Sequence, residues 1–195
     1  MKKDLAMPQT SFKSSFLSCE KDLEIILRKL FIESQPFSNK LIRLLAIDSK
    51  DCLENNTDKC KEKIQLLSLA ELIKQGYVRT TPVLFKEEFA EIQSYILISF
   101  DNFVTNETNP NFRDCSVSFD IICNTETWDI GNYRLRPLKI AGYIDGILNN
   151  QKLTGIGTFQ FIGGSQLILS EKLGGYSIHY LAIHGNDDKI PPKES

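Results

Sequence analysis

Residues 114–185 carry the clearest hydrophobic pattern of the chain, and its period changes at marked boundaries. Polar and apolar residues alternate over most of residues 116–123, which is the signature of a half-buried strand. Pro137 then opens a segment in which apolar residues recur every three or four positions, as on one face of a helix. Strand-like runs follow at residues 155–162 and 176–183. This part of the chain is therefore predicted to run strand, helix, strand, strand.

The first part of the chain is dominated by helical periodicity. An apolar stripe over residues 20–31 predicts one helix, which Pro36 ends. Ser38 is a plausible N-cap for a second, short helix. A third helical pattern ends at Gly76. The apolar positions of these helices are Leu23, Ile26, Leu27, Leu30 and Phe31, then Leu41, Ile42, Leu44 and Leu45, then Ile64, Leu67, Leu69, Leu72 and Ile73.

A strand at residues 94–100 and a connection at residues 103–112 complete the expected fold. We predict the α+β class, with an antiparallel or mixed sheet of about four or five strands covered by helices. The order is strand, strand, helix, strand, strand, after a helical N-terminal extension. We expect one domain, residues 1–195, made of a flexible arm (1–18), a helical region (19–76), an α+β module (77–185) and a tail (186–195). Residues 48–60 form a polar, exposed insert within the helical region.

Composition excludes some classes of function. The 195 residues are 42% hydrophobic and 25% charged, which is ordinary for a globular domain. The net charge of −2 gives no basic field for gripping nucleic acid. No apolar run approaches the roughly 20 residues needed to span a membrane. No hydrophobic segment follows Lys2 and Lys3, so we expect no secretion signal and a chain that stays in the cytoplasm where it is made.

Catalytic and metal-binding patterns are not evident. The five cysteines form no CxxC pair, and we expect reduced thiols that fill space. His179 and His184 fall on or just after the last strand without further ligands at metal-site spacing. The segment from Gly155 to Gly157 lacks the third glycine and the following helix of a phosphate-binding loop. We therefore expect no enzyme activity, no metal and no cofactor.

The loop between the predicted strand and helix holds the candidate interface residues. It contains Trp128, the single tryptophan, and then Arg134 and Arg136. A tryptophan and two arginines at a helix start suit either a loop packed within the chain or an anchor for another subunit. Exposed strand backbone at residues 95–100 or 105–112 is a second candidate for pairing with a neighbour.

A pattern of spaced residues over residues 69–185 resembles the neck proteins of tailed bacteriophages. It is most similar to the tail-terminator or tail-completion proteins, which join tail to head. The residues that carry the resemblance are Phe119 to Cys123, Trp128, Arg134 to Arg136, Ile140, Ile144, Asp145, Leu148, Asn149, Leu153, Gly155 to Gly157 and Gly174 to Tyr176. The resemblance implies a virion protein whose copies form a ring, commonly six-fold, around the DNA channel. Its partners would be copies of itself, connector and tail-tube proteins, and passing double-stranded DNA bound without sequence specificity, with no membrane.

Other functions remain open from the sequence. The chain could belong to another ring of the neck, such as a connector or stopper. It could also be a small non-enzymatic binding module whose surface around Trp128 captures one host or phage protein. An enzyme is the third alternative, because the sequence shows no set of nucleophile, base and orienting residue.

Overall fold

The structure is a computed structural model that describes residues 15–54, 57–81, 94–105, 107, 112–153 and 157–185. The first helix, α1 (Ser15–Arg28), already covers residues 15–18 of the predicted N-terminal arm. The rest of that arm and the predicted tail lie outside the described residues, as does most of the connection after residue 105. No helix in the described part of the chain is long and apolar enough to cross a membrane.

Four helices and a single π-helical turn make up the N-terminal region. The turn, Lys29–Glu33, continues α1 directly, and α2 (Phe37–Ala46) follows. The shorter helix α3 (Asp58–Gln65) begins within the last residues of the predicted insert, and α4 (Leu69–Lys74) follows it. The stripe predicted for the first helix is buried at Ile26, Leu27, Leu30 and Phe31, while Leu23 is partly buried against the core. The first helical prediction is therefore confirmed, with a helix that begins earlier than the pattern indicated.

Two details of the predicted helices are wrong. Ser38 is not an N-cap, because α2 begins at Phe37 and the Ser38 side chain is buried within the helix. The third helical pattern is split between α3 and α4, and Ser68 caps the second piece by accepting a hydrogen bond from the Glu71 amide at 3.3 Å. Gly76 ends this region with φ +78°, in the left-handed conformation that glycine tolerates best.

A five-stranded sheet with the order β1-β2-β3-β7-β6 forms the second layer. Neighbouring strands run antiparallel, except that β1 is parallel to β2. Helix α5 (Arg136–Leu148) connects the first strands with the last, as the sequence predicts. The α+β class is confirmed. The strands are β1 (Val78–Arg79), β2 (Ser94–Thr105), β3 (Phe112–Asn124), β6 (Gln160–Ile168) and β7 (Leu173–Gly185), and β4 (Lys152–Leu153) pairs with β5 (Gly157–Thr158) in a separate two-stranded sheet.

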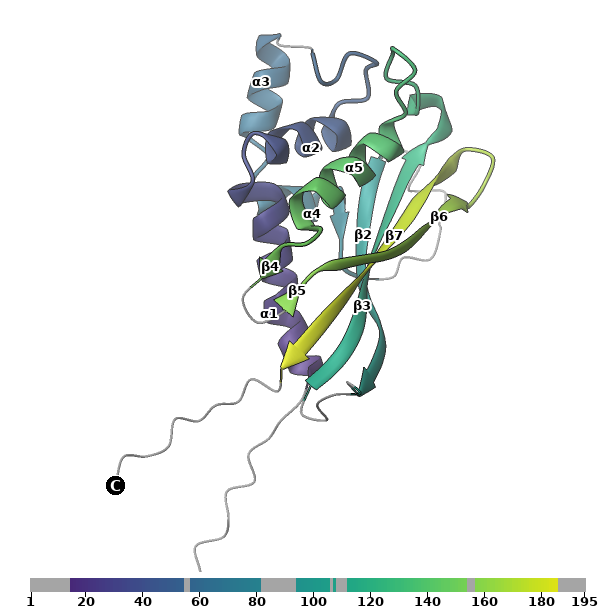
Figure 1. The fold of residues 1–195 in the computed structure, drawn as a ribbon. Coiled ribbons are helices and arrows are strands. Elements are labelled where there is room, and N and C mark those ends of the chain that lie inside the picture. Colours follow the sequence, from purple (N-terminus) through teal and green to yellow (C-terminus); the bar gives the residue numbers. More distant parts are fainter. Residues whose placement is uncertain are drawn as a thin grey trace, which may run out of the picture.

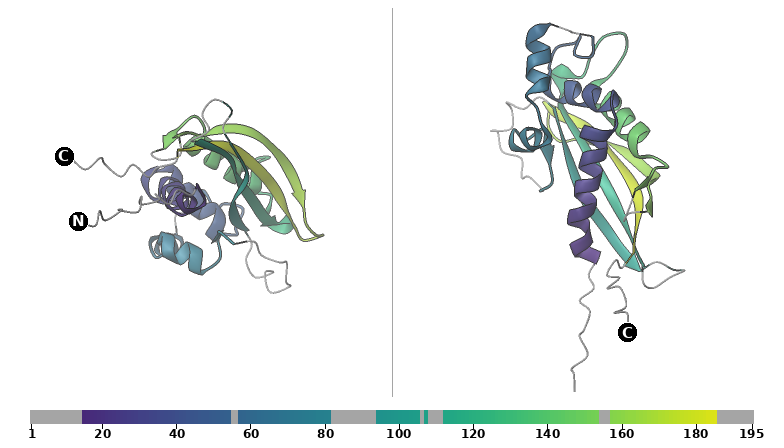
Figure 2. Two further views of the ribbon diagram at one scale, coloured as in Figure 1. Left: turned by 90° about the horizontal axis from the view of Figure 1, so that it is seen from below. Right: turned by 90° about the vertical axis from the view of Figure 1, so that its left-hand side faces the viewer.

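The core lies between one face of the sheet and the helices. Figures 1 and 2 show α1, α2 and α5 gathered on the same side of the curved sheet. Along β3 the side chains of Val117, Phe119 and Ile121 point to this side and are fully buried. They pair in register with Tyr180, Ile178 and Tyr176 of β7. The period-two alternation of β3 therefore separates a helix-covered face from a second, more polar face.

The glycine pairs of the last strands are typical in sequence of hairpin turns or bulges, and the structure places a bulge, but not the turn, beside them. Gly163 and Gly164 lie inside β6, just after a bulge at Phe161, and the chain turns instead at residues 169–172. Gly174 and Gly175 lie inside β7. A Cβ atom at Gly175 would stand 1.7 Å from the Ile121 carbonyl oxygen, so only glycine allows the two strands to approach this closely.

Candidate interface at the 125–136 loop

The loop of residues 125–136 begins with a short capped turn that fastens it to the end of the sheet. A 3-10 turn, Thr125–Thr127, follows β3 directly, and the Asn124 side chain accepts a hydrogen bond from the Glu126 amide at 2.9 Å. The Thr125 amide donates to the Lys172 carbonyl, also at 2.9 Å. The start of the loop is thereby attached to the turn between β6 and β7.

Trp128 packs within its own chain. Its indole nitrogen donates to the Cys123 carbonyl at 3.3 Å, and its ring lies 6.5 Å from the ring of Tyr176. A Cβ at Gly174 would stand 2.9 Å from the Leu167 carbonyl oxygen and in ordinary contact with the indole at 3.4 Å. The side chain is half-buried against the core. Of the two roles that the sequence left open, the contacts favour the packed one for Trp128, and part of the ring stays accessible.

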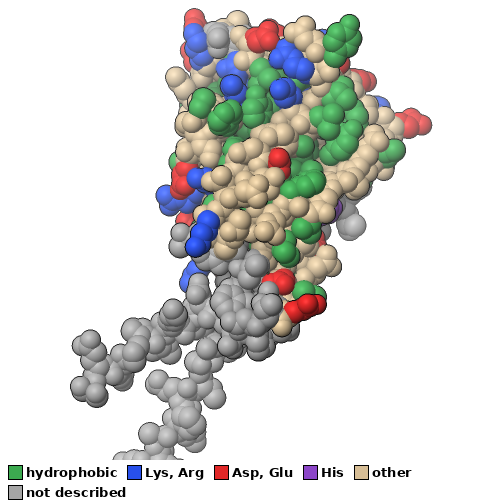
Figure 3. Space-filling view, in the orientation of Figure 1, with side chains coloured by type: hydrophobic (Ala, Val, Ile, Leu, Met, Phe, Trp, Pro, Cys, Tyr) green, Lys and Arg blue, Asp and Glu red, His purple; other side chains and the backbone are tan. Residues whose placement is uncertain are grey.

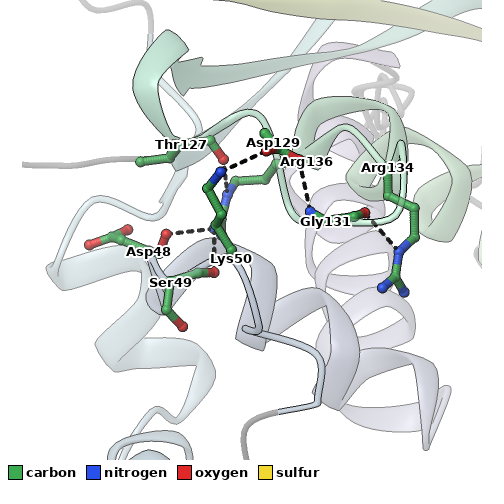
Figure 4. A network of polar contacts seen from close by, with 8 residues as sticks. All are labelled: Asp48, Ser49, Lys50, Thr127, Asp129, Gly131, Arg134 and Arg136. Carbon is green, nitrogen blue, oxygen red and sulfur yellow. Dashed lines mark hydrogen bonds and ion pairs between the residues drawn. The ribbon is translucent and has the colours of Figure 1, made fainter.

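Arg136 is the largest fully buried side chain of the described residues, and this excludes it from the subunit contact suggested by the sequence. A guanidinium carries five N–H donors. Here every donor has a backbone carbonyl as its acceptor, between α5 and the end of α2. Figure 4 shows Arg136 with three of these acceptor residues, Thr127, Asp48 and Ser49. The acceptors and distances are Thr127 at 2.8 Å, Leu44 and Ile47 at 2.7 Å, Asp48 at 2.9 Å and Ser49 at 3.1 Å.

The position of this cation has a clear electrostatic reason. The last carbonyl groups of a helix lack partners within the helix and carry partial negative charge. Leu44 belongs to the last turn of α2, and Lys63 adds a second cation there by donating to the Ala46 carbonyl at 2.5 Å. Burial raises the pKa of Asp48, against the lowering effect of Arg136 and Lys63. Arg136 therefore holds the C-terminal end of α2 in place.

The insert predicted as an exposed loop is tied to the core by the same network. Cys52 within it is fully buried, and its carbonyl accepts a hydrogen bond from Arg43 of α2 at 2.8 Å. Its outer side meets the 125–136 loop through two ion pairs, Arg134 with Glu54 at 3.0 Å and Lys50 with Asp129 at 2.7 Å. The bond from Lys50 lowers the pKa of Asp129. Both pairs lie at the surface, where solvent weakens the attraction between charges, so Arg136 contributes the larger restraint.

The tip of the loop presents an aromatic side chain that the sequence analysis did not single out. Three consecutive residues, Gly131, Asn132 and Tyr133, have φ values of 77°, 54° and 59°. The Asp129 carboxylate accepts from the Gly131 amide at 2.8 Å, and buried Ile130 anchors the turn. Tyr133 is 106% exposed. A tyrosine held in a left-handed conformation, entirely outside the fold, is an interface candidate.

Further apolar side chains surround this tip. Leu135 is 36% exposed and Leu138, in the first turn of α5, is 47% exposed. Figure 3 shows hydrophobic side chains gathered at this end of the molecule, over the start of α5 and towards the β6–β7 hairpin. Arg134, 31% exposed as a side chain, lies beside them. The candidate interface therefore consists of Tyr133, Leu135 and Leu138, with Arg134 and the accessible part of Trp128 at its border. The sequence feature that could have indicated this exposed tip is the Gly131-Asn132 pair, which is typical of a turn.

The histidine that the structure describes fully is part of a hydrogen-bonded row on the other face of the sheet. His179 faces away from Ile178 and Tyr180, as predicted. Its ring nitrogens lie 2.8 Å from the Ser118 hydroxyl and 3.2 Å from the Ser177 hydroxyl. Among the described residues, no group of three or more metal-ligating side chains comes together. The His184 side chain lies outside the described part of the chain.

Comparison with known proteins identifies the family. The family model YomW matches residues 38–182. The chain belongs to the YomW family. The match begins within α2 and includes the whole candidate interface, with α5 and nearly all of the five-stranded sheet. A search of curated proteins found no match. A solved chain described as "Virion of native gene transfer agent (GTA) particle" is similar over 64% of this chain and 90% of its own length, with 8% identity and a TM-score of 0.42.

Proposed function

We propose that this YomW-family protein is a structural protein of a tailed-phage virion. The family is phage-associated. The observation that carries the proposal is the residue pattern resembling phage neck proteins. In the structure it falls on one packed unit, with Phe119 and Ile121 on β3, Ile140 and Ile144 on α5, and Gly175 on β7. The buried residues of the pattern therefore pack in one core of this chain, which supports the proposal.

Within the virion, the proposed role is that of a tail terminator or head–tail joining protein. Copies of the chain would form a ring, commonly six-fold, around the DNA channel, between a connector and the tail tube. A closed ring needs two complementary patches on each copy. The apolar tip around Tyr133, held by Arg136, supplies a rigid patch of the kind required. A net charge of −2 suits a channel that lets DNA pass, because a strongly basic wall would bind the phosphates.

We propose further that the protein acts through contacts alone, without catalysis or cofactor. The supporting observation is that the 125–136 loop is built for rigidity, with its one buried cation fully bonded to carbonyl oxygens. Rigid presentation of an apolar tip lowers the entropy that binding must overcome.

Inactivation of the gene in the phage or prophage that encodes it tests the role directly. The expected result is a lysate with filled heads and separate tails that do not join, seen by electron microscopy. Complementation with the wild-type gene and with Leu66→Ala should restore joined particles, whereas Tyr133→Ala should restore few. Leu66 is the matched control because it is 76% exposed and distant in sequence from the loop. Normal particles from the inactivated gene, or purified virions without the chain, would contradict the proposal.

Two alternatives share the exposed tip and differ in its partner. The chain could form another ring of the neck, or it could be a small binding module that captures a host or phage protein through Tyr133. Cryo-electron microscopy of the neck separates the rings by position. A binding module would instead co-purify with one protein from cells that contain no particles, and Tyr133→Ala would lose that protein.

A further inference from the structure

The β6 strand has an open edge with no charge on it. It pairs with β7 on one side, and no other strand in the described part of the chain pairs with its second side. Residues 160–169 contain neither a charged residue nor proline, although 25% of the chain is charged. Ile162 and Ile168 are 55% and 81% exposed. An exposed, apolar strand edge offers unpaired N–H and C=O groups to another strand.

The other end of the sheet carries the features that normally prevent such pairing. There β1 covers Ile96 and Leu97 of β2, and it is only two residues long. Beyond it, β2 has a register shift between Asp101 and Val104, with Asn102 at φ 53°. A bulge and a charged side chain both discourage edge-to-edge association. The sequence suggested residues 95–100 as a pairing edge, and the structure points to β6 instead.

The regular part of β6 is long enough to accept a partner strand. Its own bulge lies at the beginning, between Phe161 and Gly163. From Gly163 to Ile168 every residue is in continuous register with β7. Six residues in register are as long as a typical strand of a globular protein.

We propose that two copies of this chain pair along β6, antiparallel and around a two-fold axis. The residue on such an axis meets its own counterpart, so a charged residue there would face a like charge. A strand without charges is therefore suited to pairing with itself. The β2 edge of a second copy is a poorer partner, because Asp101 and the bulge at Asn102 interrupt it.

The side chains of β6 are compatible with this contact. An axis perpendicular to the sheet keeps each side chain on its own face, so residues of the same parity oppose each other. A register centred on Gln166 sets Gly164 opposite Ile168. A small residue then faces a large one, and the most exposed large apolar side chain of the strand lies at the contact. The contact makes one continuous sheet from both copies and goes beyond the ring, whose head-to-tail contacts use two different patches.

The dimer is tested with the purified full chain by sedimentation equilibrium over a range of concentrations. Ile168→Lys replaces the apolar side chain that faces Gly164 of the other copy with a charged one on the strand edge, and should raise the dimer dissociation constant by at least about tenfold. Leu66→Lys makes the same chemical change at a site of similar exposure, 76% against 81%, and should leave that constant unchanged. Circular dichroism checks that both variants are folded. A wild-type chain that stays monomeric at every concentration overturns the proposal, as does a dimer equally stable in Ile168→Lys.

Amide hydrogen exchange locates the contact independently. Amides of residues 163–168 should become more protected as the wild-type concentration rises, and this gain should be lost in Ile168→Lys. Concentration-dependent protection confined to other segments would place the contact elsewhere and refute the β6 pairing. Both measurements use the free chain, so they succeed or fail independently of the virion role.

Discussion

Tyr180 of β7 donates a hydrogen bond from its phenol oxygen to a carboxylate oxygen of Asp145 in α5, at 2.8 Å. The phenol ring is fully buried, with the rings of Phe119, Phe159 and Phe161 at 5.7–5.8 Å around it. Burial raises the pKa of Tyr180, and the bond to Asp145 raises it further. One side chain thus joins the central antiparallel strands to the crossover helix.

Removal of the Tyr180 hydroxyl should destabilise the fold without changing its shape. Tyr180→Phe keeps the ring packing and leaves Asp145 without this donor, so the free energy of unfolding should fall by about 1–3 kcal/mol. Urea titration followed by circular dichroism measures it. Tyr176→Phe on the same strand is the control, with an expected change within about 0.5 kcal/mol. Equal effects of the two variants would show that the bond to Asp145 contributes nothing.

Replacement of Arg136 should be far more damaging than replacement of Arg134. Arg136→Ala leaves buried carbonyl groups without a donor and should cost more than about 3 kcal/mol, enough to unfold a marginal chain. Arg136→Lys should rescue little, because an ammonium group has only three N–H donors. Arg134→Ala loses one exposed ion pair and should cost less than about 1 kcal/mol. Thermal unfolding of the three variants measures these differences. A stable, well-folded Arg136→Ala would show that the hydrogen bonds of Arg136 do not hold the end of α2 in place.

The stripe of the first helix should behave as core. Leu27→Ala should lower the free energy of unfolding by about 2–5 kcal/mol, because the side chain is 6% exposed and a cavity would remain. Ile32→Ala, a few residues further along and 50% exposed, should cost clearly less. Chemical denaturation of both variants provides the comparison. An unchanged midpoint for Leu27→Ala would mean that α1 is not packed as described.

Tyr133→Gly should raise the stability of the protein and reduce its incorporation into joined particles. Glycine adopts positive φ freely, so relief of the left-handed conformation should raise stability by up to about 1 kcal/mol. Loss of the exposed ring should reduce incorporation into joined particles. Differential scanning calorimetry and counts of joined particles give the two readouts. A loss of stability together with normal incorporation would remove Tyr133 from the interface.

Stability should fall in alkaline solution above about pH 9. Burial raises the pKa of the Cys115 thiol to about 12 and that of Cys123 to about 11, from an ordinary value of 9.0. Below the ordinary value both states hold the proton, so stability is full there. Between the two values the unfolded chain loses the proton first, and each thiol costs about 1.4 kcal/mol per pH unit. Unfolding free energies at several pH values measure the slope, which Cys115→Ala should reduce. An identical slope in that variant would exclude Cys115 as its source.

Sequence reasoning succeeded where a local pattern determines the structure. The alternation in β3 and the three-to-four spacing in α5 are such patterns, and both elements were found. It failed where distant segments meet. Nothing around Arg136 reveals that its acceptors lie in another part of the chain, and nothing in the polar insert reveals that Cys52 is buried. The glycines at 163, 164, 174 and 175 look locally like hairpin or bulge residues, and β6 does have a bulge before Gly163. The close approach of β7 to β3 explains Gly175 only in three dimensions.

Four of the carbonyl groups bonded by Arg136 lie 87–92 positions earlier in the chain. Contacts between such distant positions form late, because a long stretch of chain must first be ordered between them. As the chain leaves the ribosome, the carbonyl groups at the end of α2 therefore lack the hydrogen bonds from Arg136 until residue 136 has emerged. An N-terminal fragment that stops before that residue should be unable to complete the helical layer. Folding of this protein is thus expected to finish only once the β3–α5 junction is present, which places the whole sequence from α1 to α5 in one cooperative unit.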